Sequence, residues 1–224
     1  MHRFPDWTDR ICACKEPSHA PKYIALTGGP GAGKTAVLEI ARRSFCHHTL
    51  ILPESAGIIY GGGFWRGHTI GAKKAAQRAI YFVQREQEEL VRADDGAAVC
   101  LCDRGTLDGL AYWPDTEKSY FAELATTKEK EFAKYAAVIH LRTPAEHEGY
   151  NNQNPLRTET ADMAAEIDKH IGEIWKTHPH YSEVTSTTHF LEKVRKVMTL
   201  IFDYMPECCL RHHQPLPGKI PGPE

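Results

Sequence analysis

The sequence lacks the features that would place it in a membrane or on a nucleic acid. None of its apolar runs approaches the ~20 residues that a membrane span requires. Residues 1–22 contain no apolar core of the kind found in signal peptides, so we expect a cytoplasmic protein. The formal net charge is only -2, which gives no electrostatic reason to expect a nucleic-acid partner. We therefore expect neither a membrane nor a nucleic acid as a partner.

The cysteines do not form the pattern of a disulfide framework or of a common zinc motif. There are 7 of them, an odd number, and Cys100 and Cys102 lie in an apparent buried strand. Near the ends, a single residue separates Cys12 from Cys14, and the segment CCLRHH occupies residues 208–213. Neither spacing is C-x-x-C. Reduced thiols are the simplest interpretation, and metal binding by the terminal Cys and His residues stays open.

What is present is the composition of a globular chain, with 42% hydrophobic and 25% charged residues. Apolar stretches without alternation predict strands that are buried on both faces. Helical patterns separate them, so we expect an α/β fold: a doubly wound, three-layer parallel sheet of about five strands with helices on both faces. Strands are expected over 22–29, 48–55, 97–105 and 136–143, and near 186–190. Residues 1–20 are interpreted as an N-terminal arm, 21–205 as one domain and 206–224 as a flexible Pro/Gly-rich tail.

The strongest motif lies in GGPGAGKT over residues 28–35, which matches G-x-x-x-x-G-K-[ST] without a mismatch. It follows a predicted strand and opens a predicted helix, the context in which glycine backbone cradles phosphates. Lys34 would neutralise the β- and γ-phosphates, and the Thr35 hydroxyl would bind Mg²⁺. The sequence thus predicts a P-loop NTPase fold whose nucleotide-binding residues are Gly28, Gly29, Pro30, Gly31, Ala32, Gly33, Lys34, Thr35 and Ala36.

A second acidic position completes the expected metal site. Asp103 comes directly after the apolar residues AVCLC, and a P-loop fold needs a carboxylate at such a strand end to hold the metal shell opposite Thr35. An ordinary strand terminus is the alternative. Arg104 follows and could reach the acceptor or the transferring phosphate, unless it is a surface arginine. Asp108, one helical turn further on, has a weaker case.

Four motifs occur in a fixed order: TGGPGAGKT, ILPESAG, CDRGTLDG and VIHLRTPAE. Their order resembles that of P-loop kinases of nucleosides and nucleotides, including deoxynucleoside kinases and the ribosylnicotinamide kinase domain of bacterial NAD regulators. It is most similar to AAA-type ATPase/kinase-like domains that carry Pro-Glu after the second strand. The resemblance covers about residues 22–200. It implies ATP and Mg²⁺ as cofactors and a P-loop kinase-like domain over 21–205.

The resemblance also assigns roles to individual residues. It places Glu54 at the acceptor hydroxyl, where a carboxylate can accept a proton, and puts Arg142 at a strand end; a capping glutamate next to Ser55 is the alternative for Glu54. It places Arg157 in a lid over the phosphates, where a guanidinium suits the phosphoryl charge, with a surface residue ahead of a helix as the alternative. The Asp/Glu-Arg-Ser signature of these kinases reads here Asp103-Arg104-Gly105, a departure that bears on the acceptor contact.

The acceptor is expected over the carboxyl ends of the strands. A glycine-rich loop offers Phe64 or Trp65 to stack on a ring and Arg66 to meet charge, although these side chains could instead pack onto the fold. One face of a long predicted helix carries four further candidates, of which Gln84 resembles a base-reading glutamine; a solvated face is the alternative. These four are Gln77, Tyr81, Gln84 and Glu88.

Two function classes follow from these residues. The first is an ATP-dependent kinase for a nucleoside, a nucleotide or a related small metabolite, with Lys34, Glu54, Asp103, Arg104 and Arg157 as its catalytic residues. The second is a regulatory NTPase or nucleotide-sensing module without a small acceptor. The absence of N-K-x-D after the fourth strand disfavours a GTPase. A sulfotransferase or a degenerate binding protein is a weaker third class.

Overall fold

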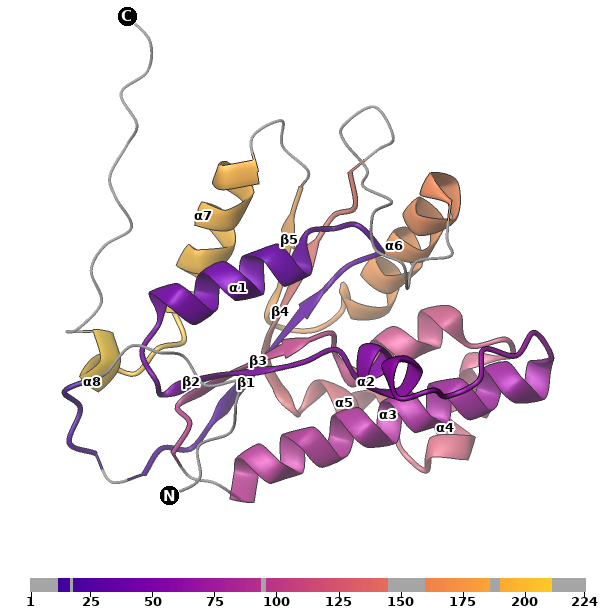
Figure 1. Ribbon diagram of the computed structural model, residues 1–224, viewed down its shortest axis with the longest axis horizontal. Coiled ribbons are helices and arrows are strands. Elements are labelled where there is room, and N and C mark those ends of the chain that lie inside the picture. Colours follow the sequence, from indigo (N-terminus) through magenta and orange to yellow (C-terminus); the bar gives the residue numbers. More distant parts are fainter. Residues whose placement is uncertain (1–11, 17, 94–95, 145–159, 186–189, 211–224) are drawn as a thin grey trace, which may run out of the picture.

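One parallel sheet organises the protein, as a computed structural model shows for residues 12–16, 18–93, 96–144, 160–185 and 190–210 (Figure 1). The strand order is β2-β3-β1-β4-β5, and all the pairs are parallel. This confirms the predicted fold class. The strands are β1 (Lys22–Thr27), β2 (Thr49–Leu52), β3 (Val99–Asp103), β4 (Tyr135–Leu141) and β5 (Tyr181–Val184).

The fifth strand is the one that the sequence placed wrongly. We expected it near 186–190, but it ends at Val184, and residues 186–189 lie outside the described part. β5 is an edge strand in which only Val184 is buried. It therefore lacks the continuous apolar run by which the other four strands, all better buried, could be recognised.

Helices cover both faces of the sheet (Figure 1). On one face lie α1 (Lys34–Ser44), α7 (Phe190–Phe202) and α8 (Glu207–Leu210). The other carries α3 (Ile70–Ala93), η1 (Thr106–Tyr112), α4 (Glu117–Leu124) and α6 (Ala161–Trp175), with α2 (Ser55–Gly61) packed on α3 and α5 (Lys128–Phe132) packed on η1. Among the described residues, no helix combines the length and the apolar character needed to cross a bilayer.

The strands supply side chains to two separate cores, one on each face. In β1, Ile24 and Leu26 enter the core under α1 and α7, whereas Tyr23 and Ala25 enter the core under α3 and α6. Burial on both sides explains why the strand sequence shows no alternation. The packed region extends past the predicted limits of 21–205, because Cys12 and Cys209 are both buried in the first core.

The register of the strands brings the functional loops to one edge of the sheet. Leu26 lies opposite Asp103, and Thr27 lies opposite His140. The P-loop starts at the next residue, so it emerges between the ends of β3 and β4. This is the position at which doubly wound sheets bind their ligands.

Candidate nucleotide and acceptor site

The phosphate loop adopts a backbone that only glycine tolerates well. Gly28, Gly31 and Gly33 have φ values of 136°, 81° and 90°. A Cβ atom on Gly28 would lie 2.1 Å from the carbonyl oxygen of Leu141, so this residue must lack a side chain. Gly33 is the N-cap of α1, and the helix N-terminus carries partial positive charge. The loop therefore has the shape and the polarity of an anion cradle.

The Lys34 ammonium is held inside this loop. Its Nζ donates to the carbonyl oxygens of Gly28 at 2.8 Å and Gly29 at 3.1 Å, and the residue is only 7% exposed. Burial and the charge of Arg104 lower the pKa of Lys34 to about 8, although Asp103 and other carboxylates oppose the shift. A bound phosphate would offer this ammonium an oppositely charged partner in place of two neutral carbonyls.

Asp103 has the environment expected of a metal-site carboxylate. It is 8% exposed and lines the same cavity as Thr35. Its Oδ1 is the single buried side-chain oxygen among the described residues with no hydrogen-bond partner. Burial raises the pKa of Asp103 to about 6, against the opposing effect of Lys34. An unsatisfied carboxylate oxygen beside a hydroxyl suits Mg²⁺, a hard cation that prefers oxygen ligands.

Arg104 is part of the site and not a surface arginine. Its Nε donates to Oε1 of Glu54 at 2.6 Å, while its NH1 group donates to the carbonyl of Gly28 at 3.1 Å and to Asp108 at 3.2 Å. Its φ is 80°, an unfavourable value for a side-chain-bearing residue. Such strain persists where surrounding contacts enforce it. Here it aims the guanidinium between the P-loop and Glu54.

Asp108 helps to hold the Arg104 guanidinium in place. It is buried, its Oδ2 accepts from the Thr27 hydroxyl at 2.6 Å, and its Oδ1 accepts from the Trp175 indole at 2.8 Å. The same indole explains the departure from the kinase signature. A Cβ atom at Gly105 would lie 2.6 Å from Cζ2 of Trp175, so a serine has no room there.

The cavity continues from the P-loop to α3. Of the four predicted helix positions, Gln77, Tyr81 and Gln84 line it, whereas Glu88 is buried beyond it. The face is thus buried and not solvated. Both ends of the Gln84 amide are already bonded: Ser55 donates to its oxygen at 2.9 Å, and its nitrogen donates to Glu88 at 3.0 Å. These bonds hold the amide in place and leave one N–H and one oxygen lone pair of Gln84 for a bound ligand.

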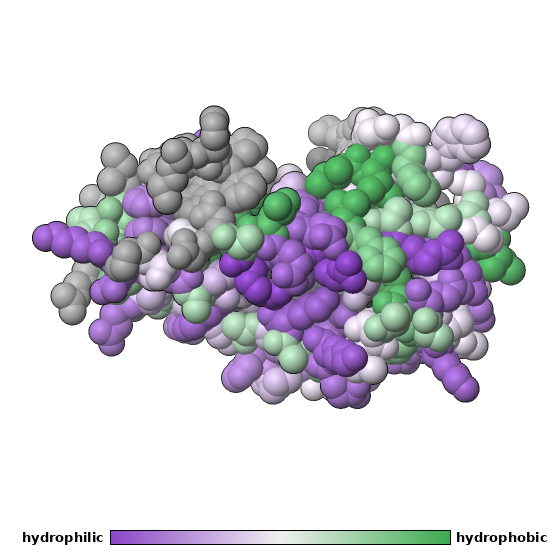
Figure 2. Space-filling view, turned by 90° about the horizontal axis from the view of Figure 1, so that it is seen from below, coloured by the Kyte–Doolittle hydropathy of each residue, from purple (hydrophilic) through white to green (hydrophobic). Residues whose placement is uncertain are grey.

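The aromatic loop contributes less than expected. Arg66 lines the cavity, with its guanidinium 4.0 Å above the Tyr60 ring. Phe64 and Trp65 do not line it, and Trp65 is 88% exposed. Figure 2 shows a patch of hydrophobic residues within a mainly hydrophilic surface on the face that is seen from below in Figure 1. The predicted lid residue Arg157 lies outside the described residues.

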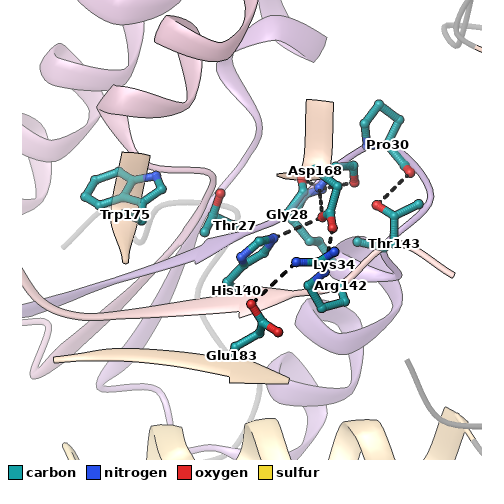
Figure 3. A network of polar contacts seen from close by, with 12 residues as sticks. Thr27, Gly28, Pro30, Lys34, His140, Arg142, Thr143, Asp168, Trp175 and Glu183 are labelled. Carbon is teal, nitrogen blue, oxygen red and sulfur yellow. Dashed lines mark hydrogen bonds and ion pairs between the residues drawn. The ribbon is translucent and has the colours of Figure 1, made fainter. Parts of the chain in front are cut away.

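A group that belongs to none of the sequence motifs fixes the P-loop from behind (Figure 3). Asp168, on α6, accepts the Gly29 N–H at 2.8 Å and pairs with Nε2 of His140 at 3.0 Å. Its other oxygen lies 2.9 Å from Nε of Arg142. Arg142 thus follows its strand as predicted but points to Asp168 and Glu183, at 3.5 Å, instead of lining the cavity.

A buried lysine makes a second tie to the loop. Lys193, on α7, donates to the carbonyl oxygens of Ala32 at 2.8 Å and Arg142 at 2.7 Å. A signal for both residues was present in the sequence. Asp168 shares a helix face with Ala164, Ile171 and Trp175, and Lys193 shares one with Val197 and Ile201. A charged residue on an apolar helix face indicates a buried polar contact.

The Asp168 network should make stability depend on pH. Burial raises the pKa of Asp168, but the His140 hydrogen bond, the Gly29 amide and Arg142 outweigh it and leave the pKa below its usual value. A depressed pKa stabilises the folded state above the unfolded-state value of about 3.9, and this contribution is lost as the pH falls below it. Asp168→Asn should therefore lower the free energy of unfolding by about 2–4 kcal/mol at pH 7.

Urea unfolding of both proteins between pH 7 and pH 3 would test this. The gap between wild type and Asp168→Asn should begin to narrow below pH ~4, because the carboxylate of unfolded wild type takes up a proton there, whereas the folded carboxylate, with its depressed pKa, is protonated only at lower pH. Glu166→Gln, on the exposed face of the same helix, is the matched control and should change little. A gap that stays constant down to pH 3 would show that charge is not the cause.

A comparison with models of protein families shows to which family the chain belongs. A family model described as an AAA domain matches residues 23–193, which include the P-loop, Glu54, Asp103 and Asp168. The chain belongs to this AAA-domain family. Among solved structures, the chain is similar to thymidylate kinase from Ehrlichia chaffeensis, with a TM-score of 0.50 and 13% identity. The likeness covers 81% of this chain and 99% of that chain. No curated protein matches the chain.

These comparisons agree with the geometry at the level of the fold. The AAA domain has a P-loop fold of the kinase-like type, as the motif order predicted. At 13% identity, the likeness to thymidylate kinase shows the shared fold and says nothing of the acceptor. The chemistry must therefore be argued from the site itself.

Proposed function

We propose that this protein is a cytoplasmic ATP-dependent kinase that transfers the γ-phosphate to a hydroxyl of a small metabolite, such as a nucleoside or a nucleotide. One observation carries the proposal: a single cavity holds Lys34, Thr35 and Asp103 at one end and continues past Glu54. Attack by water on a bound nucleotide would not need this extra space. A ring-bearing acceptor would fill it, and Gln77 and the ring of Tyr112 line its walls.

The side chains divide the work of an in-line transfer. Lys34 and the loop amides hold the β- and γ-phosphates, and Thr35 with Asp103 would hold Mg²⁺, which neutralises phosphate charge when bound. The acceptor oxygen forms a bond to the γ-phosphorus as the bond to the β,γ-bridging oxygen breaks, and ADP leaves. Glu54 takes the proton of the attacking hydroxyl. Arg104, held by Glu54 and Asp108, places positive charge near the transferring group.

A regulatory NTPase is the second candidate, and the glycine at position 105 is what favours it. The kinases that this sequence resembles carry a serine there. The packing of Trp175 against Gly105 provides a different reason for the glycine, because a larger residue would collide with the indole. The missing hydroxyl is therefore explained by the core and does not by itself argue against an acceptor.

A product search tests the proposal directly. The wild-type protein would be incubated with γ-labelled ATP, Mg²⁺, and either a panel of nucleosides and nucleotides or a small-metabolite extract. Lys34→Ala would be the inactive control, because it removes the charge that holds the phosphates. We expect label in a new small molecule with wild type alone. Label in free phosphate only, dependent on Lys34 but not on any added metabolite, would overturn the kinase proposal and leave the NTPase.

A further inference from the structure

A second cluster of reactive side chains lies beside the start of β2, at the end of the sheet that is opposite to the P-loop. Cys46 and His48 flank the turn that leads into β2, Cys12 comes from the N-terminal segment, and Cys209 lies on α8 (Figure 1). All four residues are buried. Their three sulfur atoms and one imidazole nitrogen all lie within 4.8 Å of one another. No disulfide joins any of the cysteines, all of which lie in the described ranges.

The distances match those of a tetrahedral metal site. With Zn–S near 2.3 Å and Zn–N near 2.0–2.1 Å, a tetrahedron requires about 3.8 Å between two sulfurs and about 3.6 Å between a sulfur and the nitrogen. Nδ1 of His48 lies 3.9 Å from Sγ of Cys46 and 3.4 Å from Sγ of Cys209. Two of the six edges therefore have about the length that such a tetrahedron requires, and all four ligand atoms lie within 4.8 Å of one another.

Hydrogen bonding among these groups does not explain the geometry equally well. Two thiols approach the same nitrogen of His48, and that nitrogen has either one lone pair or one proton to share. The two contacts must then share that lone pair or that proton, which makes each of them weak. Thiols are also weak donors, so little energy is available to gather three of them around one imidazole. A cation at the common centre would satisfy all four atoms at once.

The local backbone places the ligands without help from a metal. The N–H of Thr49 donates to the carbonyl of Cys46 at 2.9 Å, which closes a tight turn and brings Cys46 and His48 to the same side. The N–H of Cys12 donates to Nδ1 of His47 at 3.0 Å and so fixes the N-terminal segment to this turn. On the other side, the N–H of Cys209 donates to the carbonyl of Pro206 at 2.9 Å.

We propose that Cys12, Cys46, His48 and Cys209 form a structural zinc site. Three cysteines and one histidine are a ligand set of closed structural zinc sites, and the burial of all four leaves no open position for catalysis. Soft thiolates favour Zn²⁺ over Mg²⁺ or Ca²⁺, so this site and the P-loop take different cations. Binding displaces the protons of the three thiols to solvent. The zinc then joins the segment around Cys12 and helix α8 to the turn before β2.

Two neighbouring groups are weaker candidates. Cys14 with His19 and His48, and His19 with Cys208 and Cys209, each bring three ligand atoms together. Cys14, His19 and Cys208 are only half-buried, and neither group supplies the four protein ligands of a closed zinc site. They identify Cys208 as a useful control, since it neighbours Cys209 on the same helix.

The first test uses the wild-type protein and needs no substitution. Protein purified under reducing conditions should contain one equivalent of zinc by elemental analysis, and it should retain that zinc after exposure to a weak chelator. Growth with cobalt in place of zinc should give the visible absorption of tetrahedral Co²⁺ bound by thiolates. Wild-type protein that contains no zinc and gives no such absorption after cobalt is added would overturn the proposal.

The second test assigns the ligands. Cys46→Ser and Cys209→Ser should each lose the zinc or bind it far more weakly, whereas Cys208→Ser should keep a full equivalent. Because a ligand variant can fail to fold, His48→Cys provides a further check: it should retain the metal through four thiolates and shift the cobalt spectrum. Zinc lost in Cys208→Ser but kept in Cys209→Ser would overturn this ligand set. The readout is the metal itself and does not depend on kinase activity.

Discussion

Glu54→Gln should slow phosphoryl transfer by a factor of about 10²–10⁴, the usual contribution of a positioned acid or base. Glutamine has the shape of glutamate but cannot take the proton of an attacking hydroxyl. Its side-chain oxygen can still accept the hydrogen bond that Arg104 gives to Glu54 at 2.6 Å. The positions of the guanidinium and of the P-loop should therefore survive, and ATP affinity should change little.

The measurement is the turnover number with the acceptor that the product search finds, together with ATP binding by calorimetry. Glu183→Gln is a matched control, because Glu183 also pairs with an arginine of the site region but does not line the cavity. Its turnover should stay near that of wild type. Unchanged turnover in Glu54→Gln would remove Glu54 from the mechanism, and an equal loss in both variants would indicate a general effect of the altered ion pairs.

Asp103→Asn should inactivate the protein and stabilise it at the same time. Activity should fall by about 10²–10³ or more, because the metal shell loses its carboxylate. The free energy of unfolding without Mg²⁺ should rise by about 1–3 kcal/mol at pH 7. The reason is that burial raises the pKa of Asp103 to about 6, so the ionised form is disfavoured in the folded state. Removing that charge removes the penalty, and the pKa of about 6 already includes the opposing attraction to Lys34.

Thermal or urea unfolding in chelator, compared with unfolding in excess Mg²⁺ and nucleotide, would separate the two effects. Wild type should gain stability from the ligands, and Asp103→Asn should gain much less. Asp115→Asn is a control carboxylate outside the cavity, in an exposed ion pair with Lys74. A destabilised Asp103→Asn protein in chelator would show that the carboxylate is satisfied in the free protein, contrary to its unpartnered oxygen.

Much of the fold and half of the site followed from local sequence signals. The P-loop was predictable because the glycines, Lys34 and Thr35 are contiguous, and their backbone conformation depends on near neighbours. Asp103 was predictable because it is the first charged residue after the apolar run AVCLC, which is typical of a buried strand. Inner strands such as β3 were recognisable since both faces are buried, whereas the edge strand β5 was not.

The remaining contacts depend on tertiary structure. Asp168 accepts a hydrogen bond from Gly29, which is 139 residues away in the sequence. Trp175, on α6, leaves no room for a side chain at Gly105, which precedes η1. The two bonds that hold the Gln84 amide, from Ser55 and to Glu88, were likewise not visible in the sequence, and its role as a base reader stays a prediction. No local pattern contains such pairings, although a charged residue on an apolar helix face is a usable hint.

The contact between the two terminal segments has a consequence for protein engineering. Sγ of Cys12 lies 4.0 Å from the carbonyl oxygen of Cys208. The first and last described segments therefore meet at the end of the sheet that is opposite to the P-loop. A short peptide could join these positions, and new ends could be opened in an exposed turn such as that around Gly62 and Gly63. A circular permutant of this kind would keep every strand of the sheet in its present order.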